Sequence, residues 1–456
     1  MEINPTQADG IHPDMRPSWM FDQIAARSEL DFVSDLRSEH GDDYAIATMT
    51  NHWSQYYTGE SLDAAQALGV NSVRIPLGYW IMDTPLSGSS PEEYGISPEG
   101  FVTGGLLHLR RMLEMLAARK MTALLDVHSH PCNSACVSNG LACLGPLAFT
   151  PDGGAKLYDD VIVNDIGDIP KCPIGAGPHG FYPTTRRPSD GARTWGDVGV
   201  NAVGALAEWV AALPKETRRA VSALQLANEP ALGPPGIFDA EINRFYMRAL
   251  RAARRHLPTL PLLMSFMHPL PTVIDFLAAA AAEGAALAGG AAGGGTILAD
   301  HHYYLNWQCP AGALFSWDEI HRRACMLEAE LEAHEVDEYA AHGQKIIVGE
   351  WSMATNLDAP RDLDDPQTVA HLRRLFREQL EQFAKKPNVV GHYYWTLRMG
   401  SGWDPRPTNA HPKGRQLEGT SASRSLPDYP FRVWSLLEMA SLGIATRLDA
   451  SYEGTC

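Results

Sequence analysis

The segment "ALQLANEPALGPP" (Ala223–Pro235) begins as an apolar run and then presents an amide, a carboxylate and a proline in succession. The apolar part has the length and composition of a buried β-strand. Asn228 and Glu229 fall where such a strand would end, and Pro230 cannot donate a hydrogen bond to a neighbouring strand. The segment therefore places two polar side chains at the rim of a sheet, where parallel sheets carry their functional groups.

Six further apolar runs accompany this one, and longer helical patterns lie between them. The seven runs are Val70–Gly78, Thr122–Ser129, Ala223–Glu229, Pro261–Phe266, Thr296–Tyr304, Lys345–Trp351 and Val389–Leu397. Because the runs are apolar on both faces, they are typical of parallel strands covered on both sides. Apolar residues at three- and four-residue spacing predict amphipathic helices over Gly105–Lys120, Asp239–His256 and Thr368–Lys386. This alternation predicts βα units.

Seven βα units predict an α/β protein with a TIM (β/α)8 barrel. The eighth strand would be the first in the chain, and it is doubtful or missing, because residues 21–41 have a helical pattern. A long insertion follows the third strand. We expect an irregular N-terminal segment over residues 1–50, a barrel over 51–445 with a cysteine-rich insertion at 129–198, and a tail at 446–456.

Composition restricts the partners of this 456-residue chain. Its net charge of -17 argues against nucleic acid and against an anionic membrane surface, because both attract clusters of Lys and Arg. The sequence contains no run of about 18 apolar residues, so we expect no transmembrane helix. The first residues lack the charged and apolar regions of a signal peptide. These features fit a neutral or cationic substrate.

The seven cysteines do not decide whether the protein belongs to an oxidising or a reducing compartment. Four of them crowd into the insertion, at Cys132, Cys136, Cys143 and Cys172. Such clustering is found in disulfide-stapled loops of oxidising compartments, and free thiols are the alternative. The odd total leaves at least one cysteine unpaired, and the sequence does not fix the pairing.

Polar residues gather at the predicted strand ends. They are Arg74, His128, Asn228, Glu229, His302, Tyr304, Glu350 and Trp395. Two carboxylates across a barrel mouth suit glycoside hydrolysis, in which one donates a proton and the other attacks or assists at the anomeric carbon. Arg74 near Glu350 would keep that residue ionised as the nucleophile, whereas Glu229 would begin the cycle protonated. Trp395 could present a flat apolar face to a sugar ring.

An ordered set of motifs strengthens this interpretation. They are His52–Trp80, "LQLANEPALGP" (Leu224–Pro234), "DHHYYLNW" (Asp300–Trp307) and "VGEWSMATN" (Val348–Asn356). Together they resemble glycoside hydrolase family 5, most nearly its fungal-type exo-β-1,3-glucanases. The likeness runs from about Pro17 to Leu442. The "NEP" triplet alone is less specific, because it occurs in related barrel families.

The resemblance implies a role for each strand-end residue. Glu229 would be the acid/base and Glu350 the nucleophile of a retaining double displacement. Asn228 would bind the sugar 2-hydroxyl. Arg74 and Tyr304 would hydrogen-bond the nucleophile, and His302 would orient the acid/base. The two remaining residues, His128 and Trp395, would contact the sugar in the cleavage subsite, with Trp395 as its platform. We expect no metal or other cofactor, and we expect a monomer.

The chain also departs from the family pattern. The usual "N-L-G-G-W"-like strand before "MRPSWMF" is replaced by "MEINPTQADGIHPD", the usual "D-L-H-G" reads "DVHSH" (Asp126–His130), and the region after Trp395 matches only loosely. The expected partner is therefore an oligo- or polysaccharide. The sequence does not determine which linkage is cleaved, or whether cleavage is exo or endo. The resemblance and the clustered cysteines suggest an extracellular protein, although no signal peptide is visible.

Three alternatives remain open from the sequence. The protein could be a β-1,4- or β-1,6-glucanase of the same family. It could be a zinc-dependent amidohydrolase-like barrel, because Asp-x-His-x-His at a strand end followed by Cys132 and Cys136 offers metal ligands. It could also be an inactive carbohydrate-binding barrel, although both glutamates are present.

Overall fold

The described residues cover most of the predicted barrel. The computed structural model describes residues 29–130, 148–149, 155–156, 162–163, 170–171, 193–230, 237–266, 270–305, 315–327, 334–355, 363–398, 433–448, 452 and 454–456. Several residues named above lie outside these ranges, namely Cys132, Cys136, Cys143, Cys172 and Trp307. Expectations about them, about the pairing of the four insertion cysteines and about residues 1–28 remain predictions.

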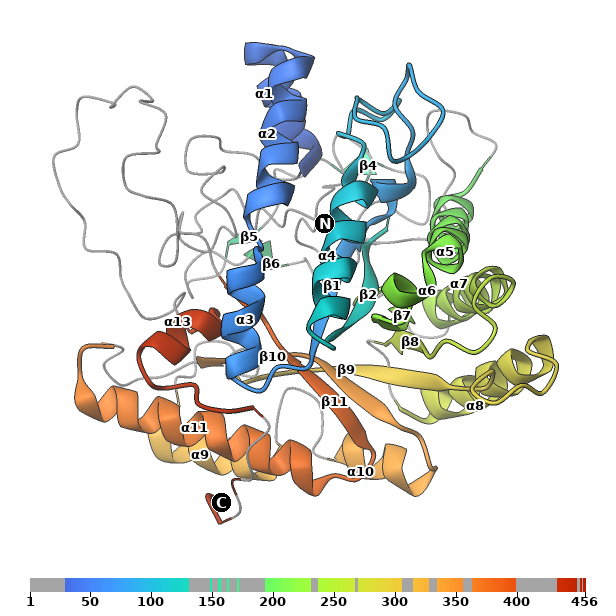
Figure 1. Ribbon diagram of the computed structural model, residues 1–456. Coiled ribbons are helices and arrows are strands. Elements are labelled where there is room, and N and C mark those ends of the chain that lie inside the picture. The colour runs from blue at the N-terminus through green and yellow to red at the C-terminus, as the bar shows by residue number, and fades with distance from the viewer. Residues whose placement is uncertain are drawn as a thin grey trace, which may run out of the picture.

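Seven parallel strands form one curved sheet in which chain order and spatial order coincide (Figure 1). The strands are β1 (Ser72–Gly78), β2 (Thr122–Ser129), β7 (Val221–Gln225), β8 (Leu262–Ser265), β9 (Ile297–Leu305), β10 (Ile346–Thr355) and β11 (Val389–Tyr394). Each predicted strand is therefore confirmed. Consecutive parallel pairing with helices between the strands is the architecture of a TIM barrel.

The sheet is open between β11 and β1, where an eighth strand would close it. No strand of the described residues occupies this position. The two edges are linked by side chains, since the Oγ of Ser72 and the hydroxyl of Tyr393 lie 3.0 Å apart. The part of residues 21–41 that the structure describes is helical, as predicted, in α1 (Glu29–His40). It is followed by α2 (Asp42–Gln55) and α3 (Gly59–Ala67).

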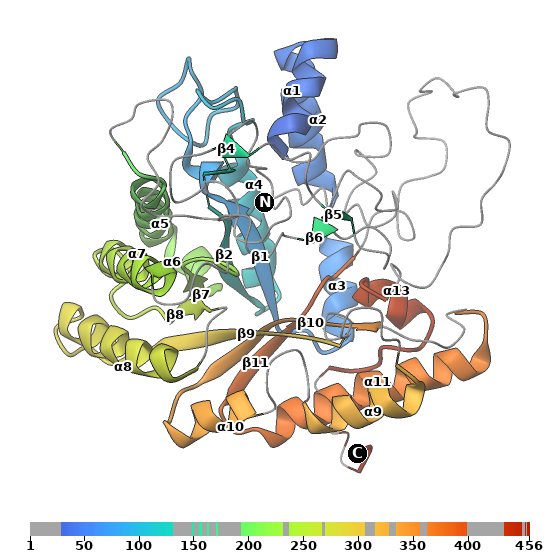
Figure 2. The same ribbon diagram turned by 180° about the vertical axis from the view of Figure 1, so that it is seen from behind.

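Helices cover the outer face of the sheet, as Figures 1 and 2 show from opposite sides. They include α4 (Gly105–Ala118), α5 (Trp195–Ala212), α6 (Lys215–Arg218), α7 (Ile237–Arg254), α8 (Leu270–Leu287), α9 (Trp317–Met326), α10 (His334–Ala341), α11 (Pro366–Lys385) and α13 (Leu436–Ser441). The three predicted helices correspond to α4, α7 and α11. One apolar core joins β1, β2, β7, β8 and β9 to α4, α5, α7 and α8, and another joins β9, β10 and β11 to α9, α11 and α13. None of the described helices is both long and apolar enough to cross a membrane.

The insertion after β2 contains two short antiparallel ladders among its described residues. Ala148–Phe149 (β3) pairs with Ala155–Lys156 (β4), and Ile162–Val163 (β5) pairs with Pro170–Lys171 (β6). The main chain rejoins the barrel at α5. The side chain of Thr194 caps this helix by accepting from the amide of Asp197, whose carboxylate accepts from the amide of Thr194 in return.

The interior of the barrel is layered by the two-residue period of its strands. A lower apolar layer consists of Leu124, Ala223, Leu263, Leu298 and Ile347, one residue from each of five neighbouring strands. Two residues further along three of these strands, the layer above is polar and contains Asp126, Gln225 and Asp300, all buried. The polar residues at the carboxyl ends of the strands therefore stand on a buried polar floor.

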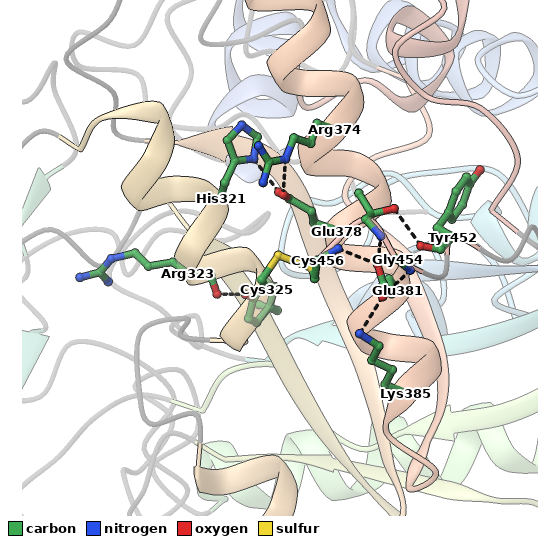
Figure 3. Close-up of a disulfide and its surroundings, with 12 residues drawn as sticks. His321, Arg323, Cys325, Arg374, Glu378, Glu381, Lys385, Tyr452, Gly454 and Cys456 are labelled. Atoms are coloured by element: carbon green, nitrogen blue, oxygen red, sulfur yellow. Dashed lines mark hydrogen bonds and ion pairs between the residues drawn. A yellow bond between two sulfur atoms is a disulfide. The ribbon is translucent and has the colours of Figure 1, made fainter.

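A disulfide between Cys325 and Cys456 joins the end of α9 to the C-terminal segment (Figure 3). The carboxylate of Glu381 in α11 accepts from the amides of Gly454, Thr455 and Cys456, at 3.1, 2.8 and 3.0 Å. Hydrogen bonds from these groups and from Lys385 lower the pKa of Glu381 to about 2. No local pattern pairs these two cysteines, because they are 131 residues apart.

We expect the Cys325→Ala/Cys456→Ala variant to lose about 2–4 kcal/mol of unfolding free energy, because the disulfide closes a long loop and restricts the unfolded chain. Thermal denaturation with and without reductant measures this. Reductant should lower the melting temperature of the wild type by more than that of the variant, because only the wild type has this disulfide to lose. Equal melting temperatures of wild type and variant without reductant would contradict the expectation.

Candidate active site

The guanidinium of Arg74, on β1, lies at the centre of the site. Its Nη1 donates to Glu350 at 2.6 Å and its Nη2 to Asn228 at 2.6 Å. Its Nε donates to Gln225 at 3.1 Å, and the carboxylate of Asp126 lies 2.9 Å from Nη2. One buried cation thus connects four strands or strand ends.

The charge of Arg74 is maintained by these neighbours. Burial by itself would lower its pKa, but the negative charges of Asp126, Glu350 and Asp300 outweigh burial and raise it. The side chain is only 3% exposed. The guanidinium is therefore a permanent positive charge beneath the mouth of the barrel.

A β-bulge determines where Glu350 points. The pairing of β10 with β9 shifts between Val348 and Glu350, so that Glu350 lies opposite His302. Gly349 occupies the bulge, and a Cβ atom there would come within 1.9 Å of the Oδ1 of Asp300. Only glycine fits this position. The strand also continues to Thr355, four residues beyond the predicted end, so Glu350 lies within the strand.

Arg74 and Tyr304 hold the two oxygens of Glu350. Arg74 donates to Oε1, and the hydroxyl of Tyr304 donates to Oε2 at 2.7 Å. Burial alone would raise the pKa of Glu350, but the positive charges of His302 and Arg74, together with the hydrogen bond from Tyr304, lower it below its usual value. Glu350 is therefore an ionised, buried carboxylate.

Glu229 has an unusual backbone conformation. Strand β7 ends at Gln225, so Asn228 and Glu229 lie in the turn beyond it rather than in the strand. Glu229 has a φ of +34°, in the left-handed region that costs energy for a residue with a side chain. Such strained positions are concentrated at functional sites. Its side chain is 24% exposed, whereas that of Glu350 is 8% exposed, so Glu229 has the better access to solvent.

His302 links the two glutamates. Its Nδ1 lies 2.6 Å from the Oε1 of Glu229 and 3.6 Å from the Oε2 of Glu350. A ring nitrogen of His302 and one carboxylate oxygen from each glutamate all lie within 4.8 Å of one another. The two carboxylates therefore approach each other across the barrel mouth.

His128 and Trp395 form a second part of the site. The two rings are stacked with their centroids 5.5 Å apart and their planes 8° apart. The Nδ1 of His128 bonds the carboxylate of Asp126 at 2.6 Å, and its Nε2 lies 3.3 Å from the side-chain nitrogen of Asn228. Trp395 follows β11 directly, and the peptide bond after it is cis.

All eight predicted site residues are thus within one connected cluster, although Arg74 and Glu350 lie within β1 and β10 rather than at the carboxyl ends predicted for them. The sequence interpretation did not include the buried residues below them, Asp126, Gln225 and Asp300. The signal was present, because Asp126 and Asp300 each precede a site histidine by two residues. On a strand this spacing places both side chains on the same face.

The zinc alternative predicted that the histidines of "DVHSH" would be metal ligands. Both nitrogens of His128 face protein groups, and the Nε2 of His130 bonds the carbonyl of Leu226 at 2.8 Å. His130 also packs against Phe245. Cys132 and Cys136 lie outside the described residues. Within the part of the chain that the structure describes, these histidines serve hydrogen bonding inside the barrel.

Comparisons with known proteins support the fold. No protein-family model matches the chain. The chain is 26% identical to a glucan 1,3-β-glucosidase of Blumeria graminis over 121 residues, which is 26% of each chain. It is 28% identical to a probable glucan endo-1,6-β-glucosidase B of Aspergillus fumigatus over 105 residues, 23% of this chain and 24% of the relative. The match therefore spans about a quarter of the length of these curated relatives.

The fold is similar over a much longer range. A solved rutinosidase from Aspergillus niger superposes with a TM-score of 0.57 at 13% identity and covers 98% of both chains. The solved structure of AoRut gives a TM-score of 0.56 at 15% identity over 88% of this chain and 89% of its own. The overall fold is therefore similar to that of these two solved structures. The chain resembles glycoside hydrolase family 5 and its fungal glucan 1,3-β-glucosidases, as the motifs indicated.

We expect Arg74→Met to lower the free energy of unfolding by about 3–5 kcal/mol, because it leaves buried carboxylates without their cation. The matched control is Arg219→Met, which removes an exposed pair with Glu216 and should cost about 0–1 kcal/mol. Urea denaturation of the three proteins measures both effects. If the two variants are equally stable, the central role of Arg74 in the fold is wrong.

Proposed function

We propose that this protein is a retaining β-glycosidase that hydrolyses β-glucan, with β-1,3-linked glucose favoured. Glu229 is the acid/base and Glu350 the nucleophile. The observation that carries the proposal is the approach of the two carboxylates, whose oxygens come within 4.8 Å. Retaining enzymes hold these groups about 5–5.5 Å apart, whereas inverting enzymes leave about 6.5–9.5 Å for a water molecule.

The first step forms a glycosyl-enzyme. A carboxylate oxygen of Glu350 attacks the anomeric carbon, and the electrons of the breaking glycosidic bond move to the leaving oxygen, which takes a proton from Glu229. The lowered pKa of Glu350 favours this role, because the attacking carboxylate must be ionised. In the second step Glu229 removes a proton from water, the water oxygen bonds the anomeric carbon, and the bond to Glu350 breaks.

The remaining side chains would hold the sugar. Asn228 has its Oδ1 bonded to Arg74, so its amide nitrogen is directed toward His128 and the space where a 2-hydroxyl would bind. Trp395, stacked on His128, offers an indole ring as a sugar platform. Because Tyr304 and Arg74 already donate to Glu350, both oxygens of the nucleophile are fixed before substrate binds.

The names of the relatives define the substrates to test. They include glucan 1,3-β-glucosidases and glucan endo-1,6-β-glucosidases. The fold neighbour that covers 98% of both chains is a rutinosidase, so a rutinoside is a second candidate substrate. A β-1,4-linked glucan also remains a candidate substrate. The substrate is neutral in every case, which fits a chain with a net charge of -17.

The decisive experiment incubates the protein with laminarin, a soluble cellulose derivative, a β-1,6-glucan and the rutinoside rutin, and separates the products. Glucose alone from laminarin indicates exo action, and a ladder of oligosaccharides indicates endo action. Release of rutinose from rutin without activity on the glucans favours the second candidate. If the protein binds glucans but cleaves none of the four compounds, it is an inactive carbohydrate-binding barrel and the proposal is wrong.

We expect Glu350→Gln and Glu229→Gln each to reduce hydrolysis at least about 1,000-fold without unfolding the protein, because one removes the nucleophile and the other the proton donor. Glu216→Gln, at an exposed position with 77% side-chain exposure, is the matched control and should retain the wild-type rate. Initial rates and circular dichroism measure activity and folding. Near wild-type rates in either site variant would overturn the assigned roles.

The same proposal extends to compartment and assembly. The protein would act outside the cell as a monomer on a poly- or oligosaccharide. The Cys325–Cys456 disulfide supports an oxidising compartment, because such bonds persist in secreted proteins and are rare in the cytosol.

A further inference from the structure

Two pairs of the form Asp-x-His lie side by side in the floor of the barrel. Asp126 and His128 are on β2, and Asp300 and His302 are on β9. In each pair one oxygen of the aspartate bonds the histidine, at 2.6 Å for Asp126 and 3.0 Å for Asp300. The same oxygens face Arg74, at 2.9 and 3.8 Å. The two pairs thus share a cation and have similar geometry.

The pairs differ in what the second histidine nitrogen faces. Arg74 can only donate, so its 2.6 Å bond fixes the Oδ1 of Asn228 on the arginine side and the amide nitrogen on the His128 side. The Nε2 of His128 therefore accepts, and its single proton is on Nδ1, bonded to Asp126. His128 is neutral in this arrangement.

His302 has a carboxylate at each nitrogen. Its Nε2 bonds Asp300 at 3.0 Å and its Nδ1 bonds Glu229 at 2.6 Å. Ionised Asp300 can only accept, so Nε2 carries a proton. Once Glu229 has given up its proton, its carboxylate too can only accept, so Nδ1 must then donate and the ring carries two protons. Glu350 adds a third negative group 3.6 Å from Nδ1. The negative charges of Glu229, Asp300 and Glu350 favour the imidazolium. Two other titratable groups nearby are Arg74, which lies beyond Asp300, and His301, which precedes His302 on β9.

We propose that Asp300 is a positioning residue that keeps the second proton on His302 and thereby maintains an imidazolium against Glu229. This inference rests on the proposed role of Glu229 as acid/base. When Glu229 has given its proton to the leaving oxygen, the new carboxylate has the charged Nδ1–H of His302 2.6 Å away. The proton on Nε2 stays with His302, so the glycosidic bond and the O–H bond of Glu229 are the only bonds that break in that step.

The surroundings of Asp300 fit this task. Its Oδ2 also accepts from the Nε2 of Gln225 at 2.7 Å, and its Oδ1 lies against Gly349 in the bulge. Burial alone would raise the pKa of Asp300, but His302, Arg74 and Gln225 lower it to about 2, so the carboxylate is ionised at all working pH values. Burial would lower the pKa of His302, yet the three carboxylates raise it well above its usual value.

The direct test is histidine-side-chain NMR on the full chain labelled with ¹⁵N-histidine. The signals lost in His302→Gln identify His302. In the wild type both nitrogens of His302 should be protonated at pH 8. In Asp300→Asn the pH at which the ring loses a proton should fall by at least about one unit, because a carboxylate 3.0 Å away is removed.

Asp126→Asn is the matched control. It removes the equivalent carboxylate from the other pair and from Arg74, and in that pair His128 bonds Asp126 and Asn228, whereas His302 bonds Asp300 and Glu229. We expect the titration of His302 to move by no more than a few tenths of a unit in this variant. An unchanged titration in Asp300→Asn, or an equal shift in both variants, would overturn the proposal.

Gly349→Ala provides a second route if Asp300→Asn does not fold. Its methyl group would overlap the Oδ1 of Asp300 and displace the carboxylate without removing it. The titration of His302 should again move to lower pH, and no movement in a folded Gly349→Ala protein would contradict the proposal. Circular dichroism establishes folding for each variant.

The kinetic readout separates this inference from the proposed function. Removing a negative charge beside the Glu229–His302 pair lowers the proton affinity of the pair. The alkaline limb of the kcat/KM profile should therefore move to lower pH in Asp300→Asn and stay in place in Asp126→Asn. A protein that cleaves no glycoside would contradict the proposed function, while the NMR titration would still decide the role of Asp300.

Discussion

The fold and the site both depend on one buried cation. Arg74 is provided by the first strand of the described sheet and contacts groups from β2, from the end of β7 and from β10. A buried guanidinium is tolerated only when its donors and its charge are matched. Because Asp126, Glu350, Gln225 and Asn228 supply that match, their positions are coupled, and the barrel mouth has one well-defined arrangement.

This coupling matters more because the described sheet is open between β11 and β1. In a closed barrel, backbone hydrogen bonds would hold every strand between two neighbours. Here the hydrogen bond between Ser72 and Tyr393 links the amino end of β1 to the carboxyl-terminal part of β11, and Arg74 ties β1 across the interior. On the opposite side of the molecule from α4 and α5, the C-terminal segment is fixed to α9 by the disulfide and to α11 by Glu381.

The electrostatic asymmetry of the site comes from small differences among similar parts. Glu350 is held by two donors and is almost fully buried, whereas Glu229 is more exposed and bonds a histidine. His128 and His302 follow aspartates at the same spacing, yet one faces an amide and the other a carboxylate. A single bulge at Gly349 makes room for Asp300 and turns Glu350 toward His302. The same residue types thereby acquire different surroundings.

The sequence by itself determined the βα order, the seven strands and the eight polar residues at their ends, because period-two and period-3.6 patterns are local properties of the chain. It did not locate the buried floor of Asp126, Gln225 and Asp300, whose partners come from other strands. It also placed Glu229 at the end of β7, whereas the strand stops at Gln225 and a left-handed turn follows.

Only the tertiary structure decided the pairing of Cys325 with Cys456 and the approach of the two glutamates. Cys325 and Cys456 are 131 residues apart, and no local pattern records which distant segments meet. The distance between Glu229 and Glu350 depends on the curvature of the sheet and on a bulge one residue long. Sequence periodicity specifies which face of a strand a side chain occupies, while packing across the barrel decides what it meets there.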